Sequence, residues 1–328
     1  MLKSYNKALG RLCSVDQSNL DLMPAGSTWI DLDRPTKEEE GAVERQLGLD
    51  LPTADEMLDI EPSSRLYKEN GALYLTANVV WRADSEAPET APVTFVLKDD
   101  TLVTIRYSDP RAFEAFAAYA ARHSDACRSG RHALIGLVEA IVDRAAEVLE
   151  RSGREVDAIS REIFRMKDAQ AKGRGGSTPA LRTLLARIAL NQNLVTKVRD
   201  SLVSLGRLVS FFTAAQEAKP DRDLREHARS LARDIQSLSD HSSYISNNTS
   251  FLLDASLGLI NLEQNEIIKI FSVAAVMFLP PTLVASIYGM NFDFMPELRW
   301  PLGYPFAIVL MIASAAIPFY YFKRRGWL

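Results

Sequence analysis

Residues 270–292, IFSVAAVMFLPPTLVASIYGMNF, decide the fold, because this long stretch contains no charged residue. The hydrocarbon core of a bilayer is about 30 Å thick, and roughly 20 apolar residues of helix cross it. A second uncharged stretch, 300–322, follows a short link, 293–299. The sequence therefore predicts a hairpin of two transmembrane helices, the first at about residues 268–290 and the second at 300–322.

Charge decides the expected topology of this hairpin. The basic triplet 323–325 directly follows the second span and begins the tail 323–328, whereas the link carries two acidic residues and one arginine. Positive charge is retained on the cytoplasmic side of a membrane, so the tail is expected in the cytoplasm and the link outside. Residues 1–13 lack the continuous apolar segment of a signal peptide. We therefore expect a multi-pass protein in contact with membrane lipid, with both termini cytoplasmic.

The composition of the 328-residue chain argues against several classes of protein. Its net charge of -4 lacks the basic character of nucleic-acid-binding proteins. Cys13 and Cys127 lie far apart, and the four histidines form no metal-binding pair. Neither a nucleophile beside a base nor a glycine-rich phosphate loop is evident. We expect no enzymatic activity, no organic cofactor and no nucleic-acid partner.

Residues 1–130 have the mixed pattern of an α/β cytoplasmic domain. Thr36 with Glu39, and Thr53 with Glu56, have the spacing of capping boxes at helix starts. Another helix is expected to start after residues 108–110 and to reach about residue 122. Runs rich in β-branched and aromatic residues predict four strands, at 28–32, 72–81, 92–97 and 101–107.

Long helices are expected after residue 130. Residues 131–218 predict an antiparallel pair of helices, because apolar residues repeat at steps of three and four on both sides of a glycine-rich break at 172–179. A third helix with the same spacing starts near residue 222. No cluster of proline or glycine interrupts it before Pro280, so we expect one stalk helix, 222–292, that continues into the first membrane span.

Near the membrane, the apolar spacing of this stalk helix gives way to small and polar residues on one face. Hydrocarbon satisfies no polar group, so such a face must meet water or another polar surface. One hairpin cannot enclose a water path, whereas several copies around an axis can, which predicts a homo-oligomer with a central pore. Alternatively, the hydroxyls bond back to helix carbonyls and the small residues only help packing. This polar stripe comprises Asp254, Gly258, Asn261, Asn265, Ile268, Ser272, Leu279 and Ser286, with Thr282 close to it.

The end of the first span, Tyr-Gly-Met-Asn at 288–291, resembles the signature of the CorA family of magnesium and divalent-cation channels. Segments 263–271, 278–285, 291–298 and 322–328 also look like the bacterial family pattern, so strong similarity covers about the last 70 residues. The resemblance implies an α/β cytoplasmic domain, a long helical stalk and two transmembrane helices in a funnel-shaped homopentamer of the inner membrane. It also implies that the pentamer admits Mg2+ into the cytoplasm, driven by the membrane potential.

The resemblance implies roles for individual residues. Gly289, Met290 and Asn291 would form the selectivity motif, with a ring of Asn291 side chains at the external mouth. Glu297 in the link would add negative potential there. The family's pore positions follow from counting inward from this motif without gaps. At one depth the count falls on Phe271, one residue before Ser272 of the polar stripe. These positions are Asp254, Asn265, Ile268, Phe271, Leu279 and Thr282.

In the resembled family, cytoplasmic Mg2+ also closes the channel by binding acidic residues between neighbouring soluble domains. The acidic loop with Asp84, Glu86 and Glu89 is one candidate for this regulatory site, and Asp234 on the stalk is another. Two alternatives to a magnesium channel stay open. One is a zinc transporter on the same scaffold, since the preference among Mg2+, Co2+, Ni2+ and Zn2+ is undecided. The other is a membrane-anchored coiled-coil sensor that conducts no ion.

Overall fold

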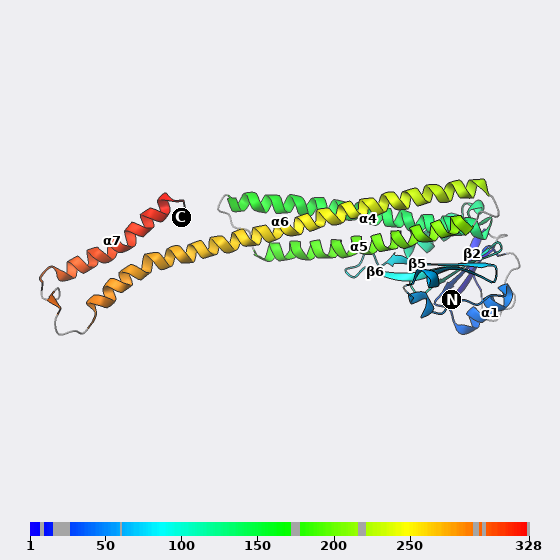
Figure 1. Ribbon diagram of the computed structural model, residues 1–328, viewed down its shortest axis with the longest axis horizontal. Coiled ribbons are helices and arrows are strands. Elements are labelled where there is room, and N and C mark those ends of the chain that lie inside the picture. Colours follow the sequence, from blue (N-terminus) through cyan, green and yellow to red (C-terminus); the bar gives the residue numbers. More distant parts are fainter. Residues whose placement is uncertain are drawn as a thin grey trace. The chain divides into compact units, whose positions relative to one another are not determined.

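The computed structural model describes residues 1–6, 10–15, 27–59, 61–171, 178–215, 221–290, 295–296 and 300–326. It comprises two compact units, one formed by Met1–Glu162 with Arg182–Leu253 and the other by Ile163–Leu181 with Asp254–Leu328. An α/β sheet domain, long helices and two apolar C-terminal helices are all present (Figure 1). These three parts of the predicted fold class are therefore confirmed.

The first unit contains a seven-stranded sheet with the strand order β2-β1-β3-β7-β6-β5-β4. Neighbouring strands are antiparallel except β3 and β7, which pair in parallel. The four strands predicted from the sequence are confirmed as β3, β5, β6 and β7. Three further strands, β1, β2 and β4, were not predicted because they are short and carry mixed polar residues. The bounds are β1 Leu2–Asn6, β2 Arg11–Ser14, β3 Trp29–Asp33, β4 Leu66–Glu69, β5 Ala72–Trp81, β6 Glu89–Lys98 and β7 Thr101–Arg106.

Short helices flank this sheet. The predicted capping box of Thr36 and Glu39 is present at the start of α1 (Lys37–Leu47), with both reciprocal hydrogen bonds formed. The second capping box also forms. The carboxylate of Glu56 accepts from the backbone N–H of Thr53 at 2.8 Å, and the backbone N–H of Glu56 donates to the hydroxyl of Thr53 at 3.4 Å. Only a single 3-10 turn, Glu56–Leu58, follows it. The remaining short elements are α2 (Pro62–Arg65), α3 (Arg111–Ala120) and the 3-10 turn Ser124–Cys127.

Two long helices, α4 (Gly130–Ala171) and α5 (Thr178–Ala215), lie beside the first part of α6 (Arg222–Tyr288) (Figure 1). Polar contacts join them, such as the 2.8 Å hydrogen bond from Gln192 of α5 to Ser246 of α6. Most of the apolar residues in the predicted rows are buried. They include Leu134, Val138, Ile141 and Val148 of α4; Leu184, Ile188, Val195 and Leu202 of α5; and Leu224, Leu231, Ile235 and Ile245 of α6.

Gly130 joins α4 closely to the sheet. Its backbone N–H donates to the carbonyl of Asp100 at 2.8 Å, in the turn between β6 and β7. A Cβ atom at this position would lie 2.6 Å from the backbone nitrogen of Leu102. Only glycine therefore permits α4 to start against this turn, and the start of α4 fixes where the rest of the helix crosses the first unit.

The second unit contains the end of α6 and α7 (Gly303–Arg324). Within the described residues, α6 and α7 are the two helices long and apolar enough to cross a membrane. Helix α7 starts three residues later than predicted and extends two residues further. The pair Pro280 and Pro281 lies inside α6, where each proline removes a backbone donor and favours a kink.

Candidate functional site

The predicted selectivity motif begins where α6 ends. The backbone N–H of Gly289 donates to the carbonyl of Ala285 at 2.9 Å, and that of Met290 donates to Ile287 at 3.3 Å. A Cβ atom at Gly289 would lie 3.1 Å from the carbonyl oxygen of Ala285, a closer contact than most Cβ atoms make. Asn291 and Glu297 lie outside the described residues, so their predicted roles at the external mouth stay predictions.

The polar stripe lies on a free face of α6. Asp254, Asn261 and Asn265 are exposed, as is the rest of the stripe. Successive residues of a helix turn by about 100°, which places these three side chains within about 20° of one line. Ser256 and Leu259 are buried, and the same geometry places them on the opposite side. Among the residues that the structure describes, the face that the sequence assigned to a pore is therefore not used for packing.

Thr282 shows that the alternative interpretation of the stripe applies in part. Its hydroxyl donates to the carbonyl of Phe278 at 2.7 Å, so its proton is engaged within the helix. The hydroxyl oxygen still has a free lone pair with which to accept from water. A pore position at Thr282 would therefore present an acceptor.

Phe271 and Ser272 are the two candidates for one depth of the predicted pore, and an open groove on α6 distinguishes between them. The groove is lined by Phe271, Leu279 and Thr282, together with Ser286 of the polar stripe, but not by Ser272. The side chains of Phe271 and Leu279 are 71% and 72% exposed. The geometry thus groups Phe271 with the other positions implied by the family resemblance. Ser272 is therefore the weaker of the two candidates for lining the pore at this depth.

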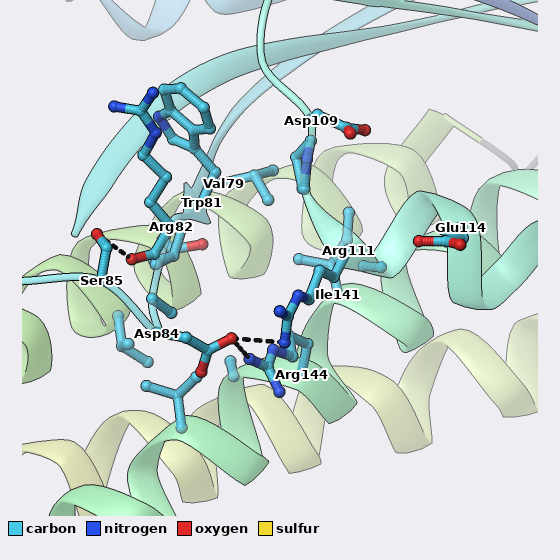
Figure 2. Close-up of a pocket in the computed structure, with 18 residues that line it drawn as sticks. Val79, Trp81, Arg82, Asp84, Ser85, Asp109, Arg111, Glu114, Ile141 and Arg144 are labelled. Atoms are coloured by element: carbon cyan, nitrogen blue, oxygen red, sulfur yellow. Dashed lines mark hydrogen bonds and ion pairs between the residues drawn. The ribbon is translucent and has the colours of Figure 1, made fainter. Parts of the chain in front are cut away.

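Asp84, the first predicted regulatory residue, is already surrounded by arginines (Figure 2). Its Oδ2 atom lies 2.6 Å from Nη1 of Arg111 and 2.7 Å from Nη2 of Arg144, and its Oδ1 atom pairs with Arg151. The hydrogen bond from Arg151 is the main cause that lowers the pKa of Asp84, helped by the charges of Arg144 and Arg111. A cation at Asp84 would have to displace these guanidinium groups.

The other regulatory candidates have fewer arginine partners. Glu89 pairs with Arg82 at 3.2 Å, whereas Glu86 and Asp234 are exposed. Asp234 is one of the acids that raise the pKa of Asp143 on α4, after burial and the charges of Glu139 and Glu147. Within the described residues, no three acidic, histidine or cysteine side chains are arranged to hold a metal ion.

Sequence reasoning missed this acidic row on α4. Glu139, Asp143 and Glu147 follow one another at steps of four residues, which places them on one face of a helix. The spacing alone could have indicated the row. Its position beside α6 is shown by the 3.1 Å ion pair between Glu139 and His227.

Sequence comparisons place these features in a family. The sequence profile described as "CorA-like Mg2+ transporter protein" matches residues 24–324. A protein of Yersinia pseudotuberculosis called "Magnesium transport protein CorA" is 36% identical over 326 residues, covering 99% of this chain and 98% of its own. A protein of the same name from Escherichia coli K12 is 35% identical over 328 residues and the full length of both chains.

Structural comparisons show the same fold. The complete CorA magnesium transporter of Methanocaldococcus jannaschii has a TM-score of 0.76 and 18% identity, covering 100% of this chain and 98% of its own. The ZntB cytoplasmic domain from Vibrio parahaemolyticus has a TM-score of 0.57 and 11% identity, covering 79% and 97%. These two likenesses concern the fold alone. The family profile and the relatives that are identical at more than a third of positions show that the chain belongs to the CorA-like Mg2+ transporter family.

Proposed function

We propose that this protein is a magnesium channel through which divalent cations enter the cytoplasm, with Co2+ and Ni2+ as further candidate ions. The observation that carries the proposal is similarity over the whole chain to proteins named for magnesium transport. The exposed face of α6, which ends at Gly289, supports it with a possible ion path. As a transporter, the protein needs neither a catalytic residue nor an organic cofactor.

The proposed path needs several copies of the chain. In a homopentamer, the exposed face of α6 would turn toward a shared axis while α7 faces lipid. Asp254 and Asn265 would then give polar rings, and Ile268, Phe271 and Leu279 would give apolar constrictions that close by losing water. These side chains are exposed, which is what an unassembled pore lining requires.

The channel would select Mg2+ at the motif 289–291. Mg2+ is small, loses its water reluctantly and usually keeps several water ligands when bound. A ring of Asn291 amide oxygens would accept hydrogen bonds from those waters without stripping them, whereas a carboxylate ring would hold a dication too tightly to release it. Glu297 in the link would raise the local concentration of cations at the mouth.

The membrane potential would drive entry. It contributes about 2.3 kcal/mol per charge for each 100 mV, and therefore about twice that for a dication. This requires the topology predicted from charge, in which both termini are cytoplasmic and the link 293–299 is external. We assign the protein to the inner membrane, with the domain boundaries at residues 130, 218, 292, 299 and 322 that the sequence predicts.

Cytoplasmic Mg2+ would close the channel by binding acidic residues of the soluble domain. Glu86 and Asp234 are the strongest of the predicted ligands, because both are exposed. Glu89 and Asp84 would first have to leave their arginine partners. Ligands from a neighbouring copy would complete such a site, since Mg2+ prefers octahedral oxygen coordination.

The decisive experiment measures Mg2+ influx into proteoliposomes under an inside-negative potential. Wild-type protein is expected to conduct, and Asn291→Ala is expected to reduce influx about tenfold or more, since it removes the proposed selecting ring. Asn248→Ala is the matched control, because helical spacing places this asparagine of α6 about 120° away from the line of Asp254, Asn261 and Asn265. Equal influx through the Asn291 and Asn248 variants would remove Asn291 from its proposed role.

The same proteoliposomes distinguish the alternatives. Influx of Zn2+ in clear preference to Mg2+ would favour the zinc transporter. The similarity of this chain to the ZntB cytoplasmic domain is one of fold only. Absence of any divalent flux from folded, assembled protein would favour the non-conducting sensor.

A further inference from the structure

His132 lies where the start of α4 meets the start of α6. Arg128 and Ser129, from the turn that precedes α4, form hydrogen bonds with its ring. Asp221, the residue before α6, approaches the ring from the other side of this junction. The side chain of His132 is only 18% exposed. A histidine thus joins the first turns of two long helices, and all of these residues belong to the first unit.

The contacts of the His132 ring determine its protonation. Nε and Nη2 of Arg128 lie 2.9 and 2.5 Å from Nε2 of His132. A guanidinium group has donors and no acceptor, so Nε2 accepts and carries no proton. The proton of the neutral ring is then on Nδ1, which donates to Oγ of Ser129 at 2.7 Å. His132 is therefore neutral in this structure and held in one tautomer.

A second proton on His132 would disrupt this arrangement. It would place an N–H group on Nε2, directly facing the N–H groups of Arg128, and would bring two positive charges into contact. His132 also lies in the first turn of α4, since its backbone N–H donates to Oγ of Ser129 at 3.4 Å. The dipole of a helix disfavours positive charge at this end. Protonation therefore requires Arg128 to move away from the ring.

Asp221 offers an acceptor to the protonated ring. Its Oδ2 atom lies 3.7 Å from Nε2 of His132 and 3.7 Å from Nη2 of Arg128. Its Oδ1 atom accepts from the backbone N–H of Leu224 at 3.2 Å, as the N-cap of α6. This N–H is the main cause that lowers the pKa of Asp221. The carboxylate therefore stays ionised in the pH range in which a histidine titrates.

Other charged groups face His132 from neighbouring elements. Asp100, in the turn between β6 and β7, favours the protonated ring, whereas His227 of α6 opposes it. Arg122, which follows α3, Asp125 of the 3-10 turn and Glu139 of α4 line the same pocket as His132. Glu139 is itself paired with His227 at 3.1 Å. Arg128 is thus the cation in direct contact with the ring, and Asp221 is the carboxylate placed to replace it.

We propose that His132 is a pH-sensitive latch between the start of α4 and the start of α6. The neutral ring binds Arg128 and Ser129. When the ring takes a proton from water, it releases Arg128 and pairs with Asp221, the N-cap of α6. The latch is independent of ion conduction and does not rest on the proposed function.

The latch operates on the acidic side of neutrality. Burial, followed by the charge of Arg128, lowers the pKa of His132 from its ordinary value of about 6.5. The folded chain therefore binds fewer protons at this ring than the unfolded chain does. The stability that the neutral ring contributes is complete above pH about 6.5 and is lost as the pH falls through the lower, folded pKa.

The test measures the pKa of each histidine in the full-length protein in detergent, from the pH dependence of hydrogen exchange at the C2 carbon of the ring, read by mass spectrometry. The pKa of His132 is expected to lie below about 6.5. Arg128→Gln is expected to raise it by about 1, because it removes the adjacent positive charge. Asp221→Asn is expected to lower it, because asparagine still caps a helix but carries no charge to stabilise the protonated ring.

Arg122→Gln is the matched control. Arg122 is an exposed arginine that lines the same pocket and donates to the carbonyl of Ala118, so this variant is expected to leave the pKa of His132 unchanged. Thermal unfolding gives a second readout. Wild-type protein is expected to lose more stability between about pH 7.5 and about pH 5.5 than His132→Gln, because glutamine accepts from Arg128 and donates to Ser129 at either pH.

The outcomes separate the latch from a histidine with a purely structural role. Opposite shifts of the His132 pKa in Arg128→Gln and Asp221→Asn, with the control unchanged, support both states of the latch. A His132 that titrates at about 6.5 or above in the wild type would overturn the proposal. So would a pKa that Arg128→Gln does not move. Absence of any effect of Asp221→Asn would overturn the pairing with α6.

Discussion

Oδ2 of Asp84 lies 2.7 Å from Nη2 of Arg144, so the loop after β5 is held to α4 by an ion pair. Arg111 and Arg151 contact the same carboxylate. Three guanidinium groups around one carboxylate leave positive charge in excess if that carboxylate is removed. The loop that the sequence assigned to metal binding thus has internal counter-ions within a single chain.

Asp84→Asn is expected to lower the free energy of unfolding at pH 7 by about 1 kcal/mol, at the upper end for exposed ion pairs. The arginines hold the pKa of Asp84 below its usual range, so its contribution is fully present above the unfolded pKa of about 4. That contribution disappears as the pH falls through the lower, folded pKa. Thermal unfolding at pH 7 and at pH 3 checks this. Glu86→Gln is the control from the same loop and is expected to have little effect at either pH.

A second ion pair, Asp31 with Arg106, joins β3 and β7 inside the sheet. The two side chains are 2% and 3% exposed, and Nη2 of Arg106 lies 3.0 Å from Oδ2 of Asp31. Asp31→Leu is expected to cost about 3–5 kcal/mol, because it leaves a buried charge with one partner fewer. Denaturant unfolding measures this. The double variant Asp31→Leu with Arg106→Met is expected to recover part of the loss, and a double variant less stable than Asp31→Leu would contradict this account.

The two cysteines should differ in reactivity. Burial raises the pKa of Cys127 to about 12, so its thiolate fraction at pH 8 is about 10⁻⁴. Cys13 is partly exposed. A thiol reagent at pH 8 is therefore expected to label one cysteine of the folded chain and both in denaturant. Rapid labelling of Cys127 in folded protein, located by mass spectrometry, would show that this part of the core opens.

The groove on α6 predicts which of two adjacent positions faces the ion path. In a background without other cysteines, Phe271→Cys is expected to react with a water-soluble cationic thiol reagent about tenfold faster than Ser272→Cys, because reactivity follows access. Flux after modification provides the readout, since a bulky group in the path blocks it. Faster reaction and stronger block at position 272 would instead favour the polar stripe as drawn from helical spacing.

Gly130→Ala is expected to destabilise the protein by about 1–3 kcal/mol, as overpacking does. Its added Cβ would lie 2.6 Å from backbone nitrogen of Leu102, which cannot move like a flexible side chain. Gly153→Ala in the same helix is the control. The nearest neighbour of its Cβ would be a side-chain carbon of Ile245 at 4.0 Å, so it is expected to stabilise α4 by about 0.5–1 kcal/mol. Thermal unfolding of both variants checks the contrast.

Local patterns predicted the elements that depend on local physics. The strands at β3, β5, β6 and β7, the capping box of Thr36 and the buried rows of the long helices follow from side-chain periodicity and backbone donors. The hairpin β1–β2 was missed because four- and five-residue strands with lysine, asparagine and serine lack a clear alternation. The motif at 288–291 indicated the family from the last 70 residues, whereas the comparisons extend the relationship to nearly the whole chain.

The sequence by itself determined the two apolar helices, the heptad spacing and the family motif, because each is a property of neighbouring residues along one element. Only the tertiary structure decided the partners of Asp84, the parallel pairing of β3 with β7 and the approach of His132 to Asp221. Each of these joins residues that lie tens of positions apart. Such pairings depend on how helices and strands pack, and periodicity within a single element carries no information about its neighbours.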